Sequence, residues 1–315
     1  MPVAASQAIF CRDIGARSRV PARFLRPPAS SATVPTMLIA RLFSIVYRMP
    51  QVKRLLWRSW YEFLARRYRD RQWTFMNYGY RPAHGAAALA LAPEDEPDRS
   101  CIQLYHLVAS AVELTGREVL EVGSGRGGGA SFVARYHRPS RVVGVDVSPR
   151  AVAFCRARHA VPGLSFEVGN AEHLGFAAAS FDAILNVESS HCYGDPGAFF
   201  REVRRVLRPE GHFLYADFRS RDELDAWRAG LLAAGLRLVV ERDITPGVVA
   251  ALDADDERKR RLIEAQVERP LRRAFHRFAA LRGTALYDEL RCGTMVYCVF
   301  VLQNCAATVN ADNPP

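Results

Sequence analysis

From residue 102 onward, short apolar runs alternate with amphipathic stretches, and this alternation predicts strands separated by helices. The pattern predicts strands at residues 118–122, 141–145, 164–168, 181–187, 211–217, 236–242 and 295–302. It predicts helices at residues 102–114, 127–137, 149–159, 197–207 and 221–234. This order is typical of an α/β fold with a doubly wound, mostly parallel, seven-stranded sheet.

One stretch interrupts the alternation. Residues 246–291 form an additional, mostly helical insertion before the last strand, with charged positions followed by apolar ones. We expect its apolar face to cover the sheet edge and to build a pocket for a substrate. We therefore divide the chain into a main domain at 101–303, a preceding helical segment and loop at 37–100, and tails at 1–36 and 304–315.

The N-terminal region differs in composition from the rest. Residues 1–36 are rich in Ala, Pro, Ser and Arg, which favours a disordered tail and leaves an organelle-targeting segment as the alternative. Residues 53–69 combine Trp and Leu at helical spacing with several arginines. Such a helix is expected either to lie on an anionic membrane surface or to pack its aromatic side on the main domain.

Charge and cysteine usage narrow the class of protein. The net charge is +10, yet 15 of the 43 basic residues and only three of the 33 acidic residues lie in the first 81 positions. The remaining chain is therefore almost neutral, which argues against a nucleic-acid-binding domain. The seven cysteines are scattered without any C-x-x-C pair, which favours a reducing compartment and predicts a cytoplasmic protein. No apolar run reaches the roughly 20 residues that span a bilayer.

A glycine-rich turn follows the first predicted strand. Glu121 ends that strand, and Gly123, Ser124 and Gly125 lead into the next helix. Glycines permit a tight turn and the close approach of a ligand, and the helix N-terminus offers free N–H groups. A carboxylate at Glu121 would repel a pyrophosphate but suits a ligand that carries an ammonium or another cation.

Acidic and amide side chains at the ends of the next strands complete this pattern. Asp146 ends the second strand at the spacing expected for a residue that grips ribose hydroxyls. Asn170 and Ala171 follow the third strand, where an amide and the backbone can bind an adenine edge. Together these positions predict a site for S-adenosyl-L-methionine, to which we also assign Val147 and Asn186.

The same motifs carry a family resemblance. Residues 118–218 contain V-L-E-V-G-S-G, G-V-D-V-S, G-N-A-E-H-L and S-F-D-A-I-L-N in the order seen in class I S-adenosylmethionine-dependent methyltransferases. The sequence further resembles the mycobacterial phthiotriol/phenolphthiotriol dimycocerosates methyltransferases from about Trp57 to Leu302. That likeness implies a Rossmann-like fold with an antiparallel last strand, and O-methylation of a lipid hydroxyl. It also implies that the aromatic segment with Phe75, Asn77, Tyr78 and Tyr80 folds over the cofactor, although simple core packing is the favoured interpretation for each of these residues alone. One departure is Asn170, where the family usually has Asp.

His191 and Asp217 are the candidate catalytic residues. His191 follows the fourth strand and titrates near neutrality, so it suits a general base or a group that orients the acceptor. Asp217 lies on the same edge and is expected to orient His191 or bind the acceptor, with a helix-capping role as the alternative. Glu188 is as readily structural as functional. The histidines show no metal spacing, so no metal site is predicted.

These observations predict a methyltransferase that uses S-adenosyl-L-methionine to O-methylate a hydroxyl of a hydrophobic lipid or polyketide-type acceptor. Two alternatives remain. One is a C-methyltransferase of a sterol-like or aromatic small molecule, and the other is an inactive, membrane-associated binding protein with the same fold.

Overall fold

The structure is a computed structural model that describes residues 59, 62, 66, 73–82 and 89–305. The predictions for residues 1–36 and for most of the basic helix at 53–69 lie outside the described residues. Seven strands form one sheet, namely β1 (Glu118–Val122), β2 (Arg141–Asp146), β3 (Leu164–Val168), β4 (Phe181–Val187), β5 (Leu207–Ser220), β6 (Arg237–Asp243) and β7 (Met295–Gln303). Their order in the sheet is β3-β2-β1-β4-β5-β7-β6.

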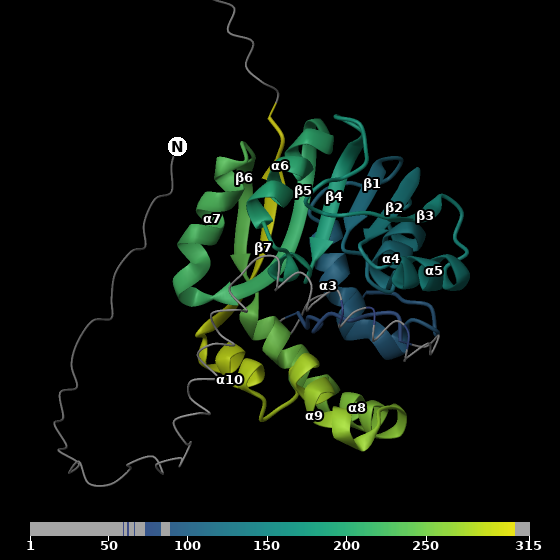
Figure 1. The fold of residues 1–315 in the computed structure, drawn as a ribbon, viewed down its shortest axis with the longest axis vertical. Helices are drawn as coiled ribbons and strands as arrows, with labels where there is room; N and C mark the ends of the chain where they lie inside the picture. The colour runs from purple at the N-terminus through teal and green to yellow at the C-terminus, as the bar shows by residue number, and fades with distance from the viewer. Residues whose placement is uncertain (1–58, 60–61, 63–65, 67–72, 83–88, 306–315) are drawn as a thin grey trace, which may run out of the picture. The chain divides into compact units, whose positions relative to one another are not determined.

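The sheet is parallel apart from its last strand. β7 pairs antiparallel with both β5 and β6, and all other pairs are parallel. The predicted seven-stranded, mostly parallel sheet with an antiparallel last strand is therefore confirmed. Figure 1 shows the strands side by side, with β3 at one edge and β6 at the other.

Helices cover both faces of the sheet. They are α3 (Arg99–Ala109), α4 (Gly128–Tyr136), α5 (Pro149–Arg158), α6 (Pro196–Val206) and α7 (Leu224–Ala233). Alternate residues of each strand point to opposite faces. In β4, Leu185 packs into the core that contains α3, α4 and α5, and Ile184 packs into the core that contains α6 and α7. Each fully buried side chain of this kind contributes about 1.5–3 kcal/mol to folding.

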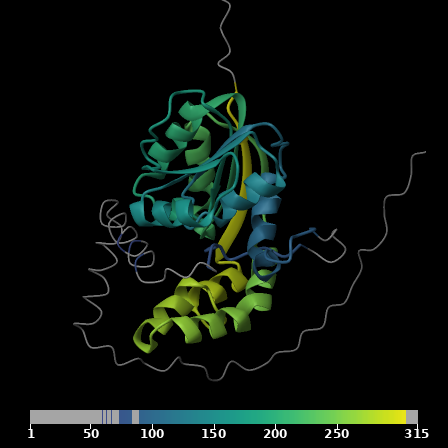
Figure 2. The same cartoon turned by 90° about the vertical axis from the view of Figure 1, so that its right-hand side faces the viewer.

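The insertion forms a helical layer at the carboxyl edge of the sheet. Its helices are α8 (Thr245–Gln266), α9 (Arg269–Phe278) and α10 (Ala285–Cys292). Figures 1 and 2 show the three helices together beneath the ends of β5 and β6. Ile263, Val267 and Phe275 form a small separate apolar core with Leu281, so the insertion has packing of its own.

Two predicted elements have boundaries that are wrong by three or more residues at both ends. The helix predicted at 102–114 begins at Arg99 and ends at Ala109, because Leu114 is buried from a loop and not from a helix. The fifth strand, predicted at 211–217, runs from Leu207 to Ser220 because β7 pairs with it as far as Ser220. Within the described residues, no helix has both the length and the apolarity to cross a membrane.

Candidate active site

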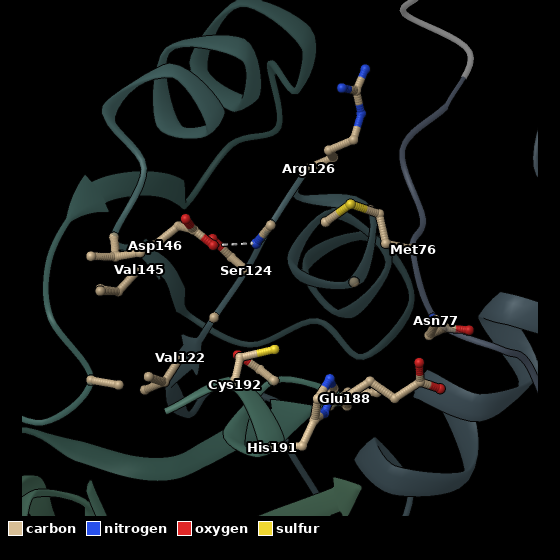
Figure 3. A pocket seen from close by; sticks show the side chains of 18 of the residues that line it. Met76, Asn77, Val122, Ser124, Arg126, Val145, Asp146, Glu188, His191 and Cys192 are labelled. Atoms are coloured by element: carbon tan, nitrogen blue, oxygen red, sulfur yellow. Dashed lines mark hydrogen bonds between the residues drawn. The ribbon is translucent and has the colours of Figure 1, made fainter. Parts of the chain in front are cut away.

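A cavity, called here the first cavity, lies at the carboxyl edge of the sheet where the strand order reverses between β1 and β4. Open α/β sheets bind their ligands at this position. Its walls include residues from 74–78, 122–126, 145–147, 169–172 and 187–193, together with Tyr105, Gly128, Gly129 and Phe278. Figure 3 shows the Met76 side chain directed toward the turn that carries Ser124, with His191 across the cavity.

The glycine turn after β1 depends on its glycines. Gly123 and Gly125 have φ values of +77° and +53°, which other residues rarely adopt. A Cβ atom on Gly123 would lie 1.9 Å from the Ser189 hydroxyl oxygen. The Gly123 and Ser124 N–H groups both donate to the Val145 carbonyl, at 2.8 and 3.0 Å. The turn is thus fixed against β2, and its outer face is open to the cavity.

Asp146 holds the turn from the end of β2. Its Oδ2 accepts a hydrogen bond of 2.9 Å from the Gly125 N–H (Figure 3). Its Oδ1 accepts one of 2.9 Å from the Ser148 N–H. Burial raises the pKa of Asp146 to about 6, although these two hydrogen bonds favour the ionised form. Below this pH the carboxylate becomes protonated and loses acceptor capacity.

Glu121 lies behind the cavity wall and does not line it. Its side chain is buried, and its Oε1 accepts a hydrogen bond of 2.7 Å from the Tyr105 hydroxyl, which does line the cavity. Its Oε2 has no hydrogen-bond partner among the described residues, and neither has the buried hydroxyl of Ser124. Burial raises the pKa of Glu121 to about 8. A buried polar atom without a partner is costly, so a polar ligand in the cavity would stabilise the Ser124 hydroxyl, which lines the cavity.

Of the other residues assigned to the cofactor, Val147, Asn170 and Ala171 line the cavity. Asn186 does not line it. Its Nδ2 donates to the Val122 carbonyl at 2.8 Å and to the Tyr193 hydroxyl at 3.0 Å, so it braces the turn from beneath.

Glu188 lines the cavity opposite the glycine turn. Its φ of +48° places a non-glycine residue in a strained left-handed conformation. Its Oε1 accepts hydrogen bonds from the Tyr78 N–H at 2.8 Å and from the Tyr297 hydroxyl at 3.0 Å. Burial raises the pKa of Glu188 to about 7, so this carboxyl group titrates near neutrality.

His191 and Asp217 meet as the sequence predicts. His191 lies in the short 3₁₀ helix η2 (Ser190–Cys192), and its Nδ1 donates to Asp217 Oδ1 at 2.8 Å. Asp217 is fully buried and also accepts from the His191 N–H at 2.9 Å and from the Ser190 hydroxyl at 2.6 Å. His191 lines the cavity and Asp217 stands behind it. The helix-capping alternative for Asp217 has no support in these contacts.

The charges around His191 favour its protonated form. Burial lowers the pKa of His191, but the adjacent Cys192 and the Asp217 carboxylate outweigh this effect and raise the pKa to about 10. Burial opposes ionisation of Asp217, and Arg219, at 3.3 Å, together with His191 holds its pKa well below the usual range. The pair therefore rests as an imidazolium beside a carboxylate at neutral pH.

Sequence reasoning missed Tyr105, Met76 and Tyr193 as cavity residues. Within the aromatic segment, residues 74–78 line the cavity, and Phe75, Tyr78 and Tyr80 also belong to the apolar core, as the core-packing alternative predicts. Tyr105, in contrast, is on a helix that precedes the first strand, and no local pattern in the sequence links it to Glu121.

The protein was compared with known proteins by sequence and by structure. The methyltransferase domain family matches residues 120–215. The phthiotriol/phenolphthiotriol dimycocerosates methyltransferase of Mycobacterium tuberculosis is 38% identical over 263 residues, which cover 83% of this chain and 97% of the relative. The chain belongs to this family. It is a class I S-adenosylmethionine-dependent methyltransferase.

Two further similarities fit this family. The fatty-acid O-methyltransferase of Mycolicibacterium smegmatis is 39% identical over 75% of this chain and 85% of its own length. The cyclopropane synthase MmaA2 from Mycobacterium tuberculosis superposes with a TM-score of 0.57 at 17% identity, over 76% of this chain and 93% of that one. The latter similarity supports the fold alone.

Proposed function

We propose that this methyltransferase O-methylates a hydroxyl group of a long-chain lipid acceptor, with His191 as the residue that takes up the hydroxyl proton. The observation that carries the proposal is the placement of the His191–Asp217 pair on the wall of the same cavity as the glycine turn. Relatives named for methylation of phthiotriol lipids and of fatty acids support a lipid acceptor.

The residues of the first cavity fit S-adenosylmethionine. Ser124 lines the cavity with a buried hydroxyl that has no hydrogen-bond partner among the described residues, and this group calls for a polar ligand. We assign Gly123, Ser124, Gly125 and Asp146 to holding the cofactor, with Val147, Asn170 and Ala171 along its other part. When bound, the cofactor supplies a methyl group already activated on a sulfonium. We assign Glu121 and Asn186 a supporting role behind the wall.

Asp217 positions His191 for proton uptake. Its carboxylate holds Nδ1 and so fixes the orientation of the imidazole ring at the cavity wall. Because the pKa of His191 is about 10, only a small fraction is unprotonated at neutral pH, and proton uptake improves as pH rises. A positive charge bound in the same cavity opposes the imidazolium and lowers this pKa.

A fatty carboxylate is a second candidate acceptor. A protonated His191 attracts an anionic acceptor, and a carboxylate needs no base before it receives a methyl group. The named activity of the relative from Mycolicibacterium smegmatis is consistent with this candidate.

One experiment separates the two acceptors. Purified protein is incubated with S-adenosylmethionine and either a long-chain secondary alcohol or a fatty acid of matched length, and mass spectrometry identifies an ether or an ester. For an alcohol, His191→Gln should lower turnover by about 10²–10⁴-fold while calorimetry shows unchanged cofactor affinity. Unchanged turnover in His191→Gln would remove the proposed role of His191.

We also propose that the basic, Trp-containing residues 53–69 bring the enzyme to an anionic membrane where a lipid acceptor resides. Replacing Arg66 and Arg67 with Glu should abolish salt-sensitive co-sedimentation with phosphatidylglycerol vesicles. Equal sedimentation of the variant and the unmodified protein would count against this role.

A further inference from the structure

A second cavity adjoins the first. Its volume is about 740 Å³, within the range of about 300–1,000 Å³ common for small-molecule sites. It is lined by residues 73–78, by the region from Glu94 to Cys101, by the C-terminal half of α8 and by α9. Thr74–Tyr78, Gly128 and Phe278 line both cavities, so the two spaces share a wall.

The shared wall is held in place by main-chain contacts on both sides. The Gly128 N–H donates to the Thr74 carbonyl at 3.3 Å, and a Cβ on Gly128 would lie 2.7 Å from that oxygen. Farther along, the Tyr78 N–H donates to Glu188 at 2.8 Å. The wall is therefore anchored to the glycine turn at one end and near His191 at the other.

The second cavity is apolar along one side. Ile263 from α8, Val267 directly after α8 and Phe275 from α9 form a continuous apolar surface, against which Trp73 and Phe278 pack. The Trp73 and Phe275 ring centroids are 6.1 Å apart. Such a surface suits hydrocarbon and offers no polar group that would orient a sugar or a nucleotide.

The charged side chains of this cavity largely satisfy one another. Asp95 accepts two hydrogen bonds from Arg135, at 2.6 and 2.9 Å, and Asp98 lies 3.6 Å from Arg258. The Lys259 ammonium group donates to the Tyr78 carbonyl at 3.4 Å. Asp95 and Asp98 are thus engaged by arginines and Lys259 by the main chain, while the side formed by Ile263 and Phe275 offers apolar surface to a ligand.

We propose that the second cavity binds the hydrocarbon chain of the acceptor, so that the acceptor extends from this cavity past Met76 and Phe278 to His191 in the first. The inference rests on the proposed lipid acceptor. It makes α8 and α9 the elements that set the preferred chain length, because they supply the apolar wall.

The test uses the full-length protein and a dansyl-labelled undecanoic acid, whose fluorescence rises in an apolar site. Leu262→Trp adds an indole at a residue that lines the cavity and lies outside the buried core of the insertion. Ala265→Trp, on the exposed side of the same helix, is the matched control. We expect Leu262→Trp to weaken probe binding by about tenfold or more, and the control to bind normally. A second filling variant, Ala279→Leu, should act in the same direction.

Calorimetry with S-adenosylmethionine checks that the variants remain folded and that the first cavity is intact. Unchanged probe affinity in both Leu262→Trp and Ala279→Leu would overturn the inference. If the filling variants lose probe binding but the unmodified protein methylates no lipid, the proposed function fails while the chain-binding cavity stands. If lipids are methylated with the same chain-length preference in Leu262→Trp, the cavity assignment fails while the function stands.

Discussion

The buried pair of His191 and Asp217 gives a prediction whose magnitude follows from the structure. Asp217→Asn keeps the shape of the side chain but removes the charge that the imidazolium and Arg219 face. Removal of one partner from a buried ion pair costs about 3–5 kcal/mol in the free energy of unfolding. The pKa of His191 gives a comparable figure. The rise from 6.5 to about 10, which Cys192 and Asp217 cause together, sets an upper bound of about 5 kcal/mol, at 1.36 kcal/mol per unit of pKa.

The sign of the pH dependence follows from the same shift. Because folding raises the pKa of His191, its contribution to stability is fully present below pH 6.5 and is lost as pH rises to about 10. The unmodified protein should therefore lose stability across this window. Asp217→Asn should be less stable at pH 6.5 and show a flatter pH profile.

Urea unfolding followed by circular dichroism measures the loss of stability in Asp217→Asn. Histidine NMR reports the pKa of His191 directly, and the His191→Gln variant assigns the His191 signal. Asp225→Asn is the matched control, since Asp225 is 94% exposed in its contact with Arg228 and should change stability by about 0–1 kcal/mol. If Asp217→Asn and Asp225→Asn were equally stable, and the pKa of His191 did not fall, the assignment of a buried ion pair would be refuted.

Three further predictions concern the first cavity. Gly123→Ala should abolish cofactor binding in calorimetry, because a Cβ there would lie 1.9 Å from the Ser189 hydroxyl oxygen and distort the turn. Gly116→Ala, at a similar φ of +72° but with nothing within 4 Å, should bind normally, and equal affinities of the two variants would refute this packing argument. Asp146→Asn should weaken cofactor affinity by about 1–3 kcal/mol. In the unmodified protein, cofactor affinity should fall below about pH 6, because the Asp146 carboxylate is then protonated. An affinity that does not change with pH would contradict the role of Asp146 in holding the cofactor. Tyr105→Phe removes the hydroxyl that donates to Glu121, and it should lower the free energy of unfolding by about 1–3 kcal/mol in thermal unfolding. Unchanged stability of this variant would show that the hydrogen bond does not contribute.

The sequence predicts the sheet well because each strand is a short apolar run bounded by turn residues. The predicted boundaries of helices and strands are wrong where contacts between distant parts of the chain determine where an element ends. Leu114 looks like the end of a helix but is an anchor in a loop, and β5 is extended by its pairing with β7. Local periodicity carries no information about either contact.

The candidate site, like the fold, has some contacts that the sequence predicts and others that it does not. His191 and Asp217 could be expected to meet, because β4 and β5 are parallel neighbours, His191 follows β4, and Asp217 lies near the end of β5. The hydrogen bond from Tyr78 to Glu188 joins residues 110 positions apart, and no spacing rule predicts it. For Asn186 the sequence predicts a cofactor contact that the cavity lining does not include. A residue near a strand end can point toward the cavity or away from it, and Asn186 instead donates hydrogen bonds to Val122 and Tyr193.

The central claim is methyl transfer to an oxygen atom of a lipid. Its most direct test is incubation with ¹³C-methyl-labelled S-adenosylmethionine and a long-chain secondary alcohol, followed by NMR of the extracted lipid. The account predicts a labelled methyl carbon bonded to oxygen, absent when His191→Gln replaces the unmodified protein. A labelled methyl group bonded to carbon would contradict it.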